Sequence, residues 1–197
     1  MKTTKKGFTL IELIVVIAII GVLAAILVPS MLGYVRKSKI SSANSTASSV
    51  QKAFESTLTD LDSKGVKLNY QGWIKINDGV FSANAGSLTN GNAASSFLGS
   101  GVANYFDKIK KVDGAAYIKN SSCTAVVATT DGTYIGTYPS GYVDAKDYKT
   151  GGELHSGGNS AIIKVVERII ADAYVAGSNE NGPEVNSNNK PSGSWDD

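Results

Sequence analysis

Hydrophobic positions divide the chain into a continuous apolar run, an amphipathic segment and a mixed remainder. Between Phe8 and Val28, a stretch of 21 residues, only Thr9 and Glu12 interrupt the apolar side chains. A helix of this length crosses a hydrocarbon core of about 30 Å. The pattern predicts a membrane-spanning helix over residues 8–28 with one acidic residue near its start.

Two residues weaken this predicted helix. Pro29 lacks an N–H and crowds the preceding helical turn, and Gly21 lowers helix propensity. We therefore expect the stretch between them to bend or partly melt once packed helices replace lipid.

The pattern becomes amphipathic after Lys39. Apolar residues recur every three or four positions, as one face of a helix requires; they are Ala43, Ala47, Val50, Phe54, Leu58 and Leu61. Gly65 is a typical helix stop. A helix over 8–63 would be about 80 Å long, with its second half lying on a folded head.

The mixed remainder predicts an α+β head. Residues 66–100 favour a long loop with a short strand at 70–77, and 102–112 favour a short helix. Runs at 115–120, 124–130 and 133–138 favour strands, the last two joined by a tight hairpin at Asp131-Gly132. We expect an antiparallel sheet of three or four strands that buries the apolar stripe of the long helix.

The end of the chain predicts a helix and then disorder. Ser160 would cap a helix ending at Gly177, although the β-branched residues leave a strand open as the alternative. Residues 178–197 are polar and rich in Gly, Asn and Pro. The expected division is a leader at 1–7, a long helix at 8–63, a head at 64–177 and a disordered tail at 178–197.

Charge is unevenly distributed along the chain. The formal net charge is +2, and residues 1–39 carry six basic side chains against Glu12 alone. No basic cluster favours nucleic acid as a partner. The one cysteine, Cys123, forms no disulfide within the chain, and we interpret it as a small buried hydrophobe.

Glu12 is unusual because it is an acidic residue inside the predicted membrane-spanning helix. A charge inside a bilayer costs about 2.5–3.5 kcal/mol and is a functional hypothesis that needs a named partner. If the chain were cut after Gly7, the new amine of Phe8 would provide a positive charge. The carboxylate of one subunit could then neutralise the amine of its neighbour.

Residues Gly7 to Glu12, read Gly-Phe-Thr-Leu-Ile-Glu, follow a short leader that contains Lys2, Lys5 and Lys6. Together with the apolar helix, this segment resembles the class III signal of type IV pilins and of type II secretion pseudopilins. The resemblance implies cleavage between Gly7 and Phe8, methylation of the Phe8 amine, and assembly through Glu12 and Phe8. It also implies that the stretch from Gly21 to Pro29 melts in the filament.

The same resemblance implies a location and partners. We expect a single-pass precursor in the cytoplasmic membrane, a prepilin peptidase, an assembly machinery, and a homopolymer that serves adhesion or motility as an extracellular pilus. The chain would be a substrate of the peptidase and not an enzyme, without cofactor or small-molecule substrate. Many pilins of bacteria with an outer membrane have a cysteine pair, so the single Cys123 favours a Gram-positive source.

Two alternatives stay open. A pseudopilin of a secretion or DNA-uptake system would share the amino-terminal chemistry. An extracellular binding protein or enzyme with an ordinary signal anchor would instead keep Met1 or be cut near Ala24 or Ala25.

Other candidate sites carry less chemistry. His155, the single histidine, lies in a glycine-rich loop, which argues against a histidine-based zinc site or catalytic triad. Asp144, Asp147 and Glu153 could gather around a calcium ion, although they lack EF-hand spacing. The tyrosines are better interpreted as sheet and edge residues than as a sugar-stacking surface; they include Tyr134, Tyr138, Tyr142 and Tyr148.

Overall fold

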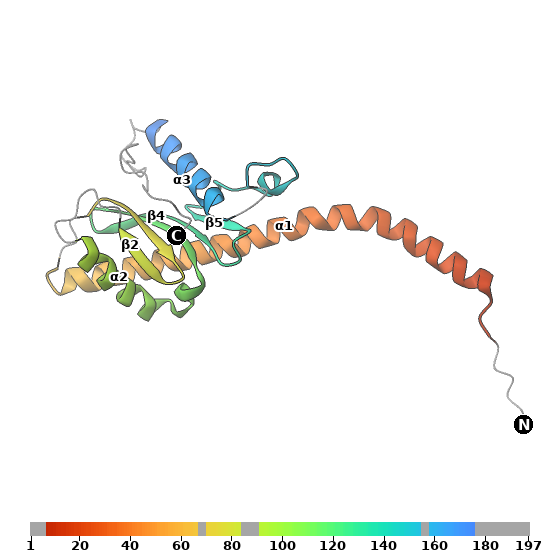
Figure 1. Cartoon of the computed structure of the whole chain (residues 1–197), viewed down its shortest axis with the longest axis horizontal. Helices are drawn as coiled ribbons and strands as arrows, with labels where there is room; N and C mark the ends of the chain where they lie inside the picture. Colours follow the sequence, from red (N-terminus) through yellow and green to blue (C-terminus); the bar gives the residue numbers. More distant parts are fainter. Residues whose placement is uncertain (1–6, 67–69, 84–90, 155–157, 176–197) are drawn as a thin grey trace, which may run out of the picture.

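A single long helix, α1 (Leu10–Ser63), runs from a free amino-terminal end into the head (Figure 1). The computed structural model describes residues 7–66, 70–83, 91–154 and 158–175. The first half of α1 projects away from the rest of the molecule, and the second half packs under the sheet. The predicted α+β class, with a long apolar helix and a small antiparallel sheet, is confirmed.

The projecting half of α1 is apolar and uncovered. No residue from Leu10 to Lys39 is buried, and the most apolar 18-residue window has a mean hydropathy of 3.2. Among the described residues, α1 is the one helix long and apolar enough to cross a membrane. It curves but stays helical through Gly21 and Pro29, so the melting expected there does not occur in the isolated subunit (Figure 1).

The head contains one antiparallel sheet of five strands in the order β2-β1-β3-β4-β5. The strands are β1 (Gly72–Asn77), β2 (Val80–Ala83), β3 (Asp113–Lys119), β4 (Ser122–Thr129) and β5 (Ile135–Tyr138). Two of the interior strands, β3 and β4, are apolar on both faces and almost fully buried. A sheet with two apolar faces needs a cover on each side.

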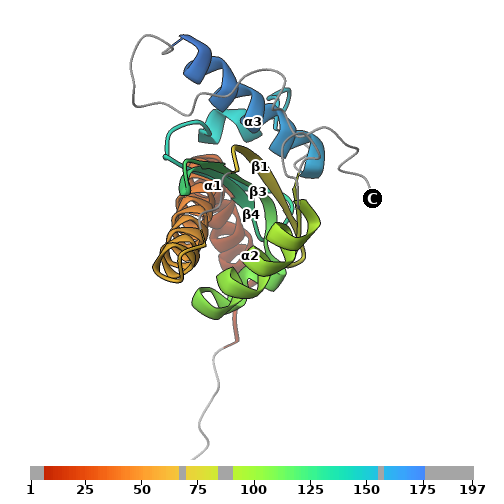
Figure 2. The same ribbon diagram turned by 90° about the vertical axis from the view of Figure 1, so that its left-hand side faces the viewer.

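Helices cover both faces of this sheet (Figure 2). The second half of α1 and α2 (Gly91–Tyr105) pack on one face, and α3 (Gly158–Val175) packs on the other. All six predicted stripe residues of α1 are buried, as the periodicity predicted. Along β3 the side chains alternate, with Ala116 and Ile118 toward α1 and Ala115 and Tyr117 toward α3. The head is thus a three-layer arrangement.

Close contact between α1 and β5 depends on Gly136. A Cβ at this position would lie 2.0 Å from the carbonyl carbon of Ala43 and 2.3 Å from the backbone nitrogen of Asn44. Because these are backbone atoms, no side-chain rotation could make room. Glycine at this position is therefore required for α1 to lie against the edge of the sheet.

Side chains occupy the outer edge of β5. The N–H of Ile135 donates to the Tyr148 hydroxyl at 2.6 Å, and the N–H of Thr137 donates to Asn44 Oδ1 at 2.8 Å. Burial raises the pKa of Tyr148 to about 12, so its hydroxyl stays neutral at physiological pH. Both outward N–H groups of this edge strand have partners within the same chain.

Several predicted elements differ from the structure. Residues 66–100 hold β1, β2 and the start of α2 rather than one short strand and a loop. The helix expected over 102–112 is the end of α2 followed by the 3₁₀ helix η1 (Asp107–Lys111), because the backbone leaves the helical region at Phe106. The predicted sheet of three or four strands has five.

The turn chemistry was also misjudged in two places. The loop between β4 and β5 is longer than a two-residue hairpin, because Asp131 Oδ1 accepts the N–H groups of Thr133 and Tyr134. The helical prediction after residue 158 is confirmed and the strand alternative is wrong, yet α3 begins at Gly158, so Ser160 is not its cap. The predicted disordered tail lies outside the described residues.

Candidate functional site at the start of α1

The first turn of α1 is closed by a reciprocal cap. Thr9 is the extended residue before the helix, and its Oγ1 accepts the N–H of Glu12 at 3.3 Å. In return, Glu12 Oε2 accepts the Thr9 N–H at 2.8 Å and the Thr9 hydroxyl at 2.6 Å. This capping box satisfies backbone donors that would otherwise be left free at the helix start. A negative charge at this end is also favoured by the helix dipole.

The cap gives Glu12 hydrogen-bond donors but no counter-charge from the described residues. Its carboxylate binds only donors of Thr9 and forms no ion pair in the part of the chain that the structure describes. Apolar side chains surround it: Phe8, Ile11, Val15 and Val16 line a shallow depression of about 350 Å³ beside the carboxylate. The charge therefore lies in an apolar setting where a positive partner would be favourable.

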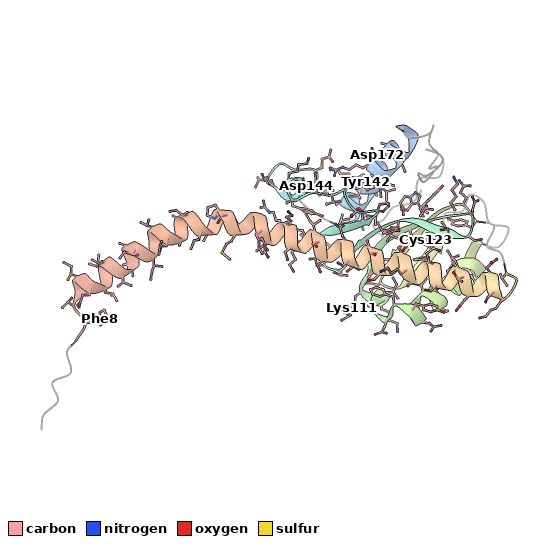
Figure 3. The ribbon with its side chains drawn as sticks, turned by 180° about the vertical axis from the view of Figure 1, so that it is seen from behind. Phe8, Lys111, Cys123, Tyr142, Asp144 and Asp172 are labelled. Carbon is pink, nitrogen blue, oxygen red and sulfur yellow. The ribbon has the colours of Figure 1, made fainter. Side chains whose placement is uncertain are left out.

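Phe8 and Gly7 lie just outside the helix. α1 starts at Leu10, two residues later than the sequence predicted, so Phe8 and Glu12 do not face each other as helical neighbours within one chain. The Phe8 side chain is 82% exposed at the free end of α1 (Figure 3), and no atom approaches the Cβ position of Gly7 within 4 Å. Within the described residues, both members of the Gly7–Phe8 peptide bond are exposed.

In the head, the Arg168 guanidinium binds two of the three carboxylates that were predicted as possible calcium ligands. Its guanidinium donates to Asp147 Oδ2 at 3.1 Å, to Asp147 Oδ1 at 3.2 Å and to Glu153 Oε2 at 2.5 Å. A further N–H of Arg168 donates to the Tyr142 carbonyl at 2.9 Å. The Asp144 carboxylate turns instead to the N–H of Ala145, at 2.6 Å. No group of three metal-ligating side chains gathers among the described residues.

This ion-pair cluster links α3 to the 3₁₀ helix η2 (Ala145–Tyr148) and its loop. Burial raises the pKa of Asp147, but the hydrogen bonds from Arg168 and from the Asp144 N–H lower it more, and the net pKa falls below the ordinary 3.8. A carboxyl group with a lowered folded-state pKa stabilises the fold above its unfolded pKa and loses this contribution as pH falls through the folded value.

We therefore predict a pH-dependent role for Arg168. At pH 7, Arg168→Gln should lower the free energy of unfolding by about 1–3 kcal/mol, because Asp147 loses a charged partner. The difference from the unaltered chain should shrink as pH falls below 3.8, where Asp147 becomes protonated in both chains. Urea unfolding at several pH values, followed by the fluorescence of buried Trp73 in a Trp195→Phe background, measures this. A difference that stays constant down to pH 2 would contradict it.

Glu55 joins α1 to the start of β4. Its Oε1 accepts the Cys123 N–H at 2.6 Å and the Ser122 hydroxyl at 2.8 Å. Cys123 is buried as predicted; burial raises the pKa of its thiol well above the ordinary value, and the nearby Glu55 carboxylate raises it further. A neutral, inaccessible thiol is chemically inert.

The remaining predicted sites are dispersed. His155 lies outside the described residues. Tyr148 is buried and its ring packs on Tyr134 with centroids 4.8 Å apart, while Tyr138 and Tyr142 are partly buried. These four tyrosines are packing residues around β5 and η2. Arg168 was not among the predicted site residues. It is a basic residue among the apolar residues of α3, and this position in the sequence could have indicated that it has a charged partner.

Comparison with known proteins finds a family match at the amino terminus and relatives that align with part of the chain. Residues 2–28 match the family model described as "Prokaryotic N-terminal methylation motif". A type IV major fimbrial protein FimA of Dichelobacter nodosus is 42% identical over 101 residues, which are 51% of this chain and 62% of that protein. A second FimA from this organism is 44% identical over 77 residues, covering 39% of this chain and 47% of its own length. No solved structure matches the chain.

The resemblance to type IV pilins is therefore confirmed, and it covers part of the chain. This chain spans about half to two thirds of the length of these fimbrial relatives. The relatives are named as fimbrial proteins, so neither the secretion pseudopilin nor the signal-anchored binding protein or enzyme is favoured.

Proposed function

We propose that this chain is the structural subunit of a type IV pilus. The observation that carries the proposal is a methylation motif over residues 2–28 on a helix whose apolar half is entirely uncovered. Such a surface is unstable in water, so it needs either lipid or the helices of other subunits. A filament built from many copies provides that cover without a second kind of protein.

Processing would come first. We propose that a prepilin peptidase cuts the exposed Gly7–Phe8 bond while α1 lies in the cytoplasmic membrane, and that the Phe8 amine is then methylated. An assembly machinery would transfer the mature subunit from the membrane to the filament outside the cell. In this scheme the chain is a substrate, and no enzymatic role is proposed for it.

Glu12 would guide the assembly. The Phe8 amine of one subunit would approach Glu12 of its neighbour, whose carboxylate lies in an apolar depression and has no counter-charge among the described residues. A charge-assisted hydrogen bond in such a setting is strong and sensitive to distance. We propose that this pair fixes the axial position of each incoming subunit.

The helix would change in the filament. At Pro29 the backbone has no N–H to donate, and Gly21 favours non-helical states, so this stretch is the weakest part of α1. We propose that it loses helicity when neighbouring helices pack against it and that it makes the filament extensible. A filament map with unbroken helix from Gly21 to Pro29 would contradict this.

The mature amino terminus tests the proposal directly. Mass spectrometry of the chain, isolated from cells that produce it with its peptidase, should find a start at Phe8 with one added methyl group. Sheared surface filaments that contain the same mature chain would support the pilus over a secretion pseudopilin. An intact Met1, or a cut near Ala24 or Ala25, would overturn the proposal in favour of an ordinary signal anchor.

A further inference from the structure

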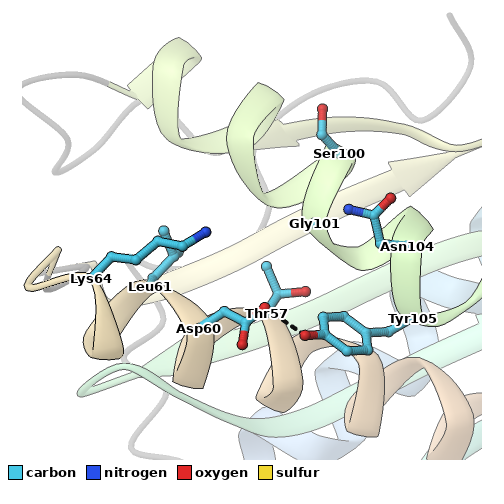
Figure 4. A pocket seen from close by; sticks show the side chains of 8 residues that line it. All are labelled: Thr57, Asp60, Leu61, Lys64, Ser100, Gly101, Asn104 and Tyr105. Carbon is cyan, nitrogen blue, oxygen red and sulfur yellow. Dashed lines mark hydrogen bonds between the residues drawn. The ribbon is translucent and has the colours of Figure 1, made fainter.

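A small pocket with both polar and apolar walls lies where the last turns of α1 meet the end of α2 (Figure 4). Its volume is about 210 Å³. The walls combine polar side chains with one aromatic ring and one leucine; the lining residues are Thr57, Asp60, Leu61, Lys64, Asn104 and Tyr105, together with Ser100 and Gly101. It lies at the end of α1 opposite to Glu12, and nothing in the proposed assembly uses it.

The floor of the pocket is a close helix contact. A Cβ at Gly101 would lie 2.3 Å from Cγ2 of Thr57, so α2 approaches α1 as closely as only glycine allows. The Thr57 hydroxyl is turned away to donate to the Ala53 carbonyl at 2.8 Å. This contact holds the two walls at a fixed separation, which is the rigidity that a binding site needs.

Tyr105 forms a rigid platform at the mouth. Its ring is 51% exposed, and its hydroxyl donates to Asp60 Oδ2 at 2.5 Å across the two helices. The hydrogen bond from Tyr105 to Asp60 raises the pKa of Tyr105, so the hydroxyl stays neutral. A ring that is fixed at its far end while its face stays exposed can stack a ligand at little entropic cost.

Polar groups around this ring are left unpaired. Asp60 Oδ1, the Lys64 ammonium and the Asn104 amide have no hydrogen-bond or ion-pair partner in the part of the chain that the structure describes. Figure 4 shows Asn104 and Tyr105 on α2 facing Asp60 and Lys64 on α1 across the pocket. The site therefore offers carboxylate and amide acceptors together with ammonium and amide donors.

We propose that this pocket binds a terminal hexopyranose of a glycan. A sugar ring has one face of C–H groups, which would stack on Tyr105, and a rim of hydroxyls that both donate and accept. Asp60 would accept a hydrogen bond from one sugar hydroxyl, and Lys64 would donate one to a neighbouring hydroxyl. The Asn104 amide can donate or accept. The opposite charges of Asp60 and Lys64 favour a neutral sugar over an anion, because a bound anion would face the Asp60 carboxylate.

The size of the pocket agrees with one sugar unit. Sites for drug-sized ligands are about 300–1,000 Å³, and this one is smaller. It is also open to solvent, as the exposed Tyr105, Asn104 and Lys64 show, so further units of a glycan could continue outward. The proposal concerns the folded head alone and does not depend on filament assembly.

Saturation-transfer NMR of the full chain in micelles of a detergent without a sugar headgroup tests this inference. The probes are the methyl pyranosides of glucose, galactose, mannose and N-acetylglucosamine at millimolar concentration. At least one should receive saturation on its ring protons. Tyr105→Ala should weaken that signal about tenfold, whereas Tyr105→Phe should keep most of it because the stacking face remains.

Two further variants make the outcome decisive. Lys64→Gln should weaken binding, while Tyr34→Ala, which removes another exposed tyrosine far from the pocket, should not. Each variant must unfold at the same urea concentration as the unaltered chain. The proposal is overturned if none of the four probes receives saturation, or if Tyr105→Ala and Lys64→Gln leave the signal unchanged.

Discussion

Replacing Glu12 with alanine is expected to leave the precursor in the membrane and to reduce filament yield about a hundredfold. Under the proposed pairing, the variant leaves the Phe8 amine of a neighbouring subunit uncompensated in an apolar environment. Such an unpaired charge costs about 2.5–3.5 kcal/mol for each added subunit, which is about two powers of ten. Immunoblots of sheared filaments and of the membrane fraction measure both quantities in one culture.

The capping box provides the matched control. Glu12 also closes the first turn of α1 through Thr9, so its loss could act on the helix and not on the neighbour. Thr9→Val removes the side-chain half of that cap but keeps the carboxylate, and it should assemble nearly normally. Glu12→Asp keeps the charge on a shorter side chain and should assemble partly. If Thr9→Val fails as completely as Glu12→Ala, the carboxylate acts within its own helix and the pairing is wrong.

Gly136→Ala is expected to have the largest effect on the stability of the head. The added Cβ would lie 2.0 Å from the carbonyl carbon of Ala43, so α1 and β5 would have to separate along their contact. Overpacking usually lowers the free energy of unfolding by about 1–3 kcal/mol. A clash with backbone atoms should cost at least the upper end of that range, because the backbone cannot rotate away. Urea unfolding of the full chain, followed by the fluorescence of Trp73 in the Trp195→Phe background, should show a loss of about 3 kcal/mol or more.

A second glycine distinguishes backbone from side-chain crowding. Gly101→Ala should also destabilise the head, but here the obstructing atom is Cγ2 of Thr57. Thr57→Ser removes that atom and keeps the hydroxyl, so the double variant Gly101→Ala, Thr57→Ser should recover most of the loss. No single side-chain change can rescue Gly136→Ala, since its neighbours there are main-chain atoms. Gly33→Ala, on the projecting half of α1 with nothing within 4 Å, should not destabilise the head.

Periodicity was sufficient to predict α1 and the class of the fold. Its stripe residues recur at helical spacing, and each of them is buried because this face of α1 packs against the sheet and α2. The same reasoning favoured a helix at α3 despite its β-branched residues, where Ile162, Val166 and Ile169 share one face. Repeating patterns over many residues outweigh local propensity.

The sequence could not predict the features that depend on distant partners. The strand β2 is four residues long and becomes a strand only by pairing with β1. Asp131-Gly132 has the composition of a tight hairpin, but the Asp131 carboxylate binds two backbone N–H groups beyond it and widens the loop. Arg168 meets Asp147 and Glu153 only after α3 folds over the sheet.

The candidate assembly site was more predictable than the pocket. Gly7, Phe8 and Glu12 lie within six consecutive residues, so a short sequence motif is enough to identify them. The pocket unites residues of α1 and α2 that are some forty positions apart, and Tyr105 reaches Asp60 because the helices touch at Gly101. No short-range pattern in the sequence marks such a site.

The side chains bound along the outer edge of β5 affect how neighbouring heads can contact one another. An edge strand with free N–H groups recruits strands from other molecules, and this is a common route to aggregation. In this head the two outward N–H groups of β5 are already bound, one to Tyr148 and one to Asn44. Heads held side by side at very high local concentration would therefore meet at this edge through side chains and not through added strands; the opposite edge of the sheet is β2.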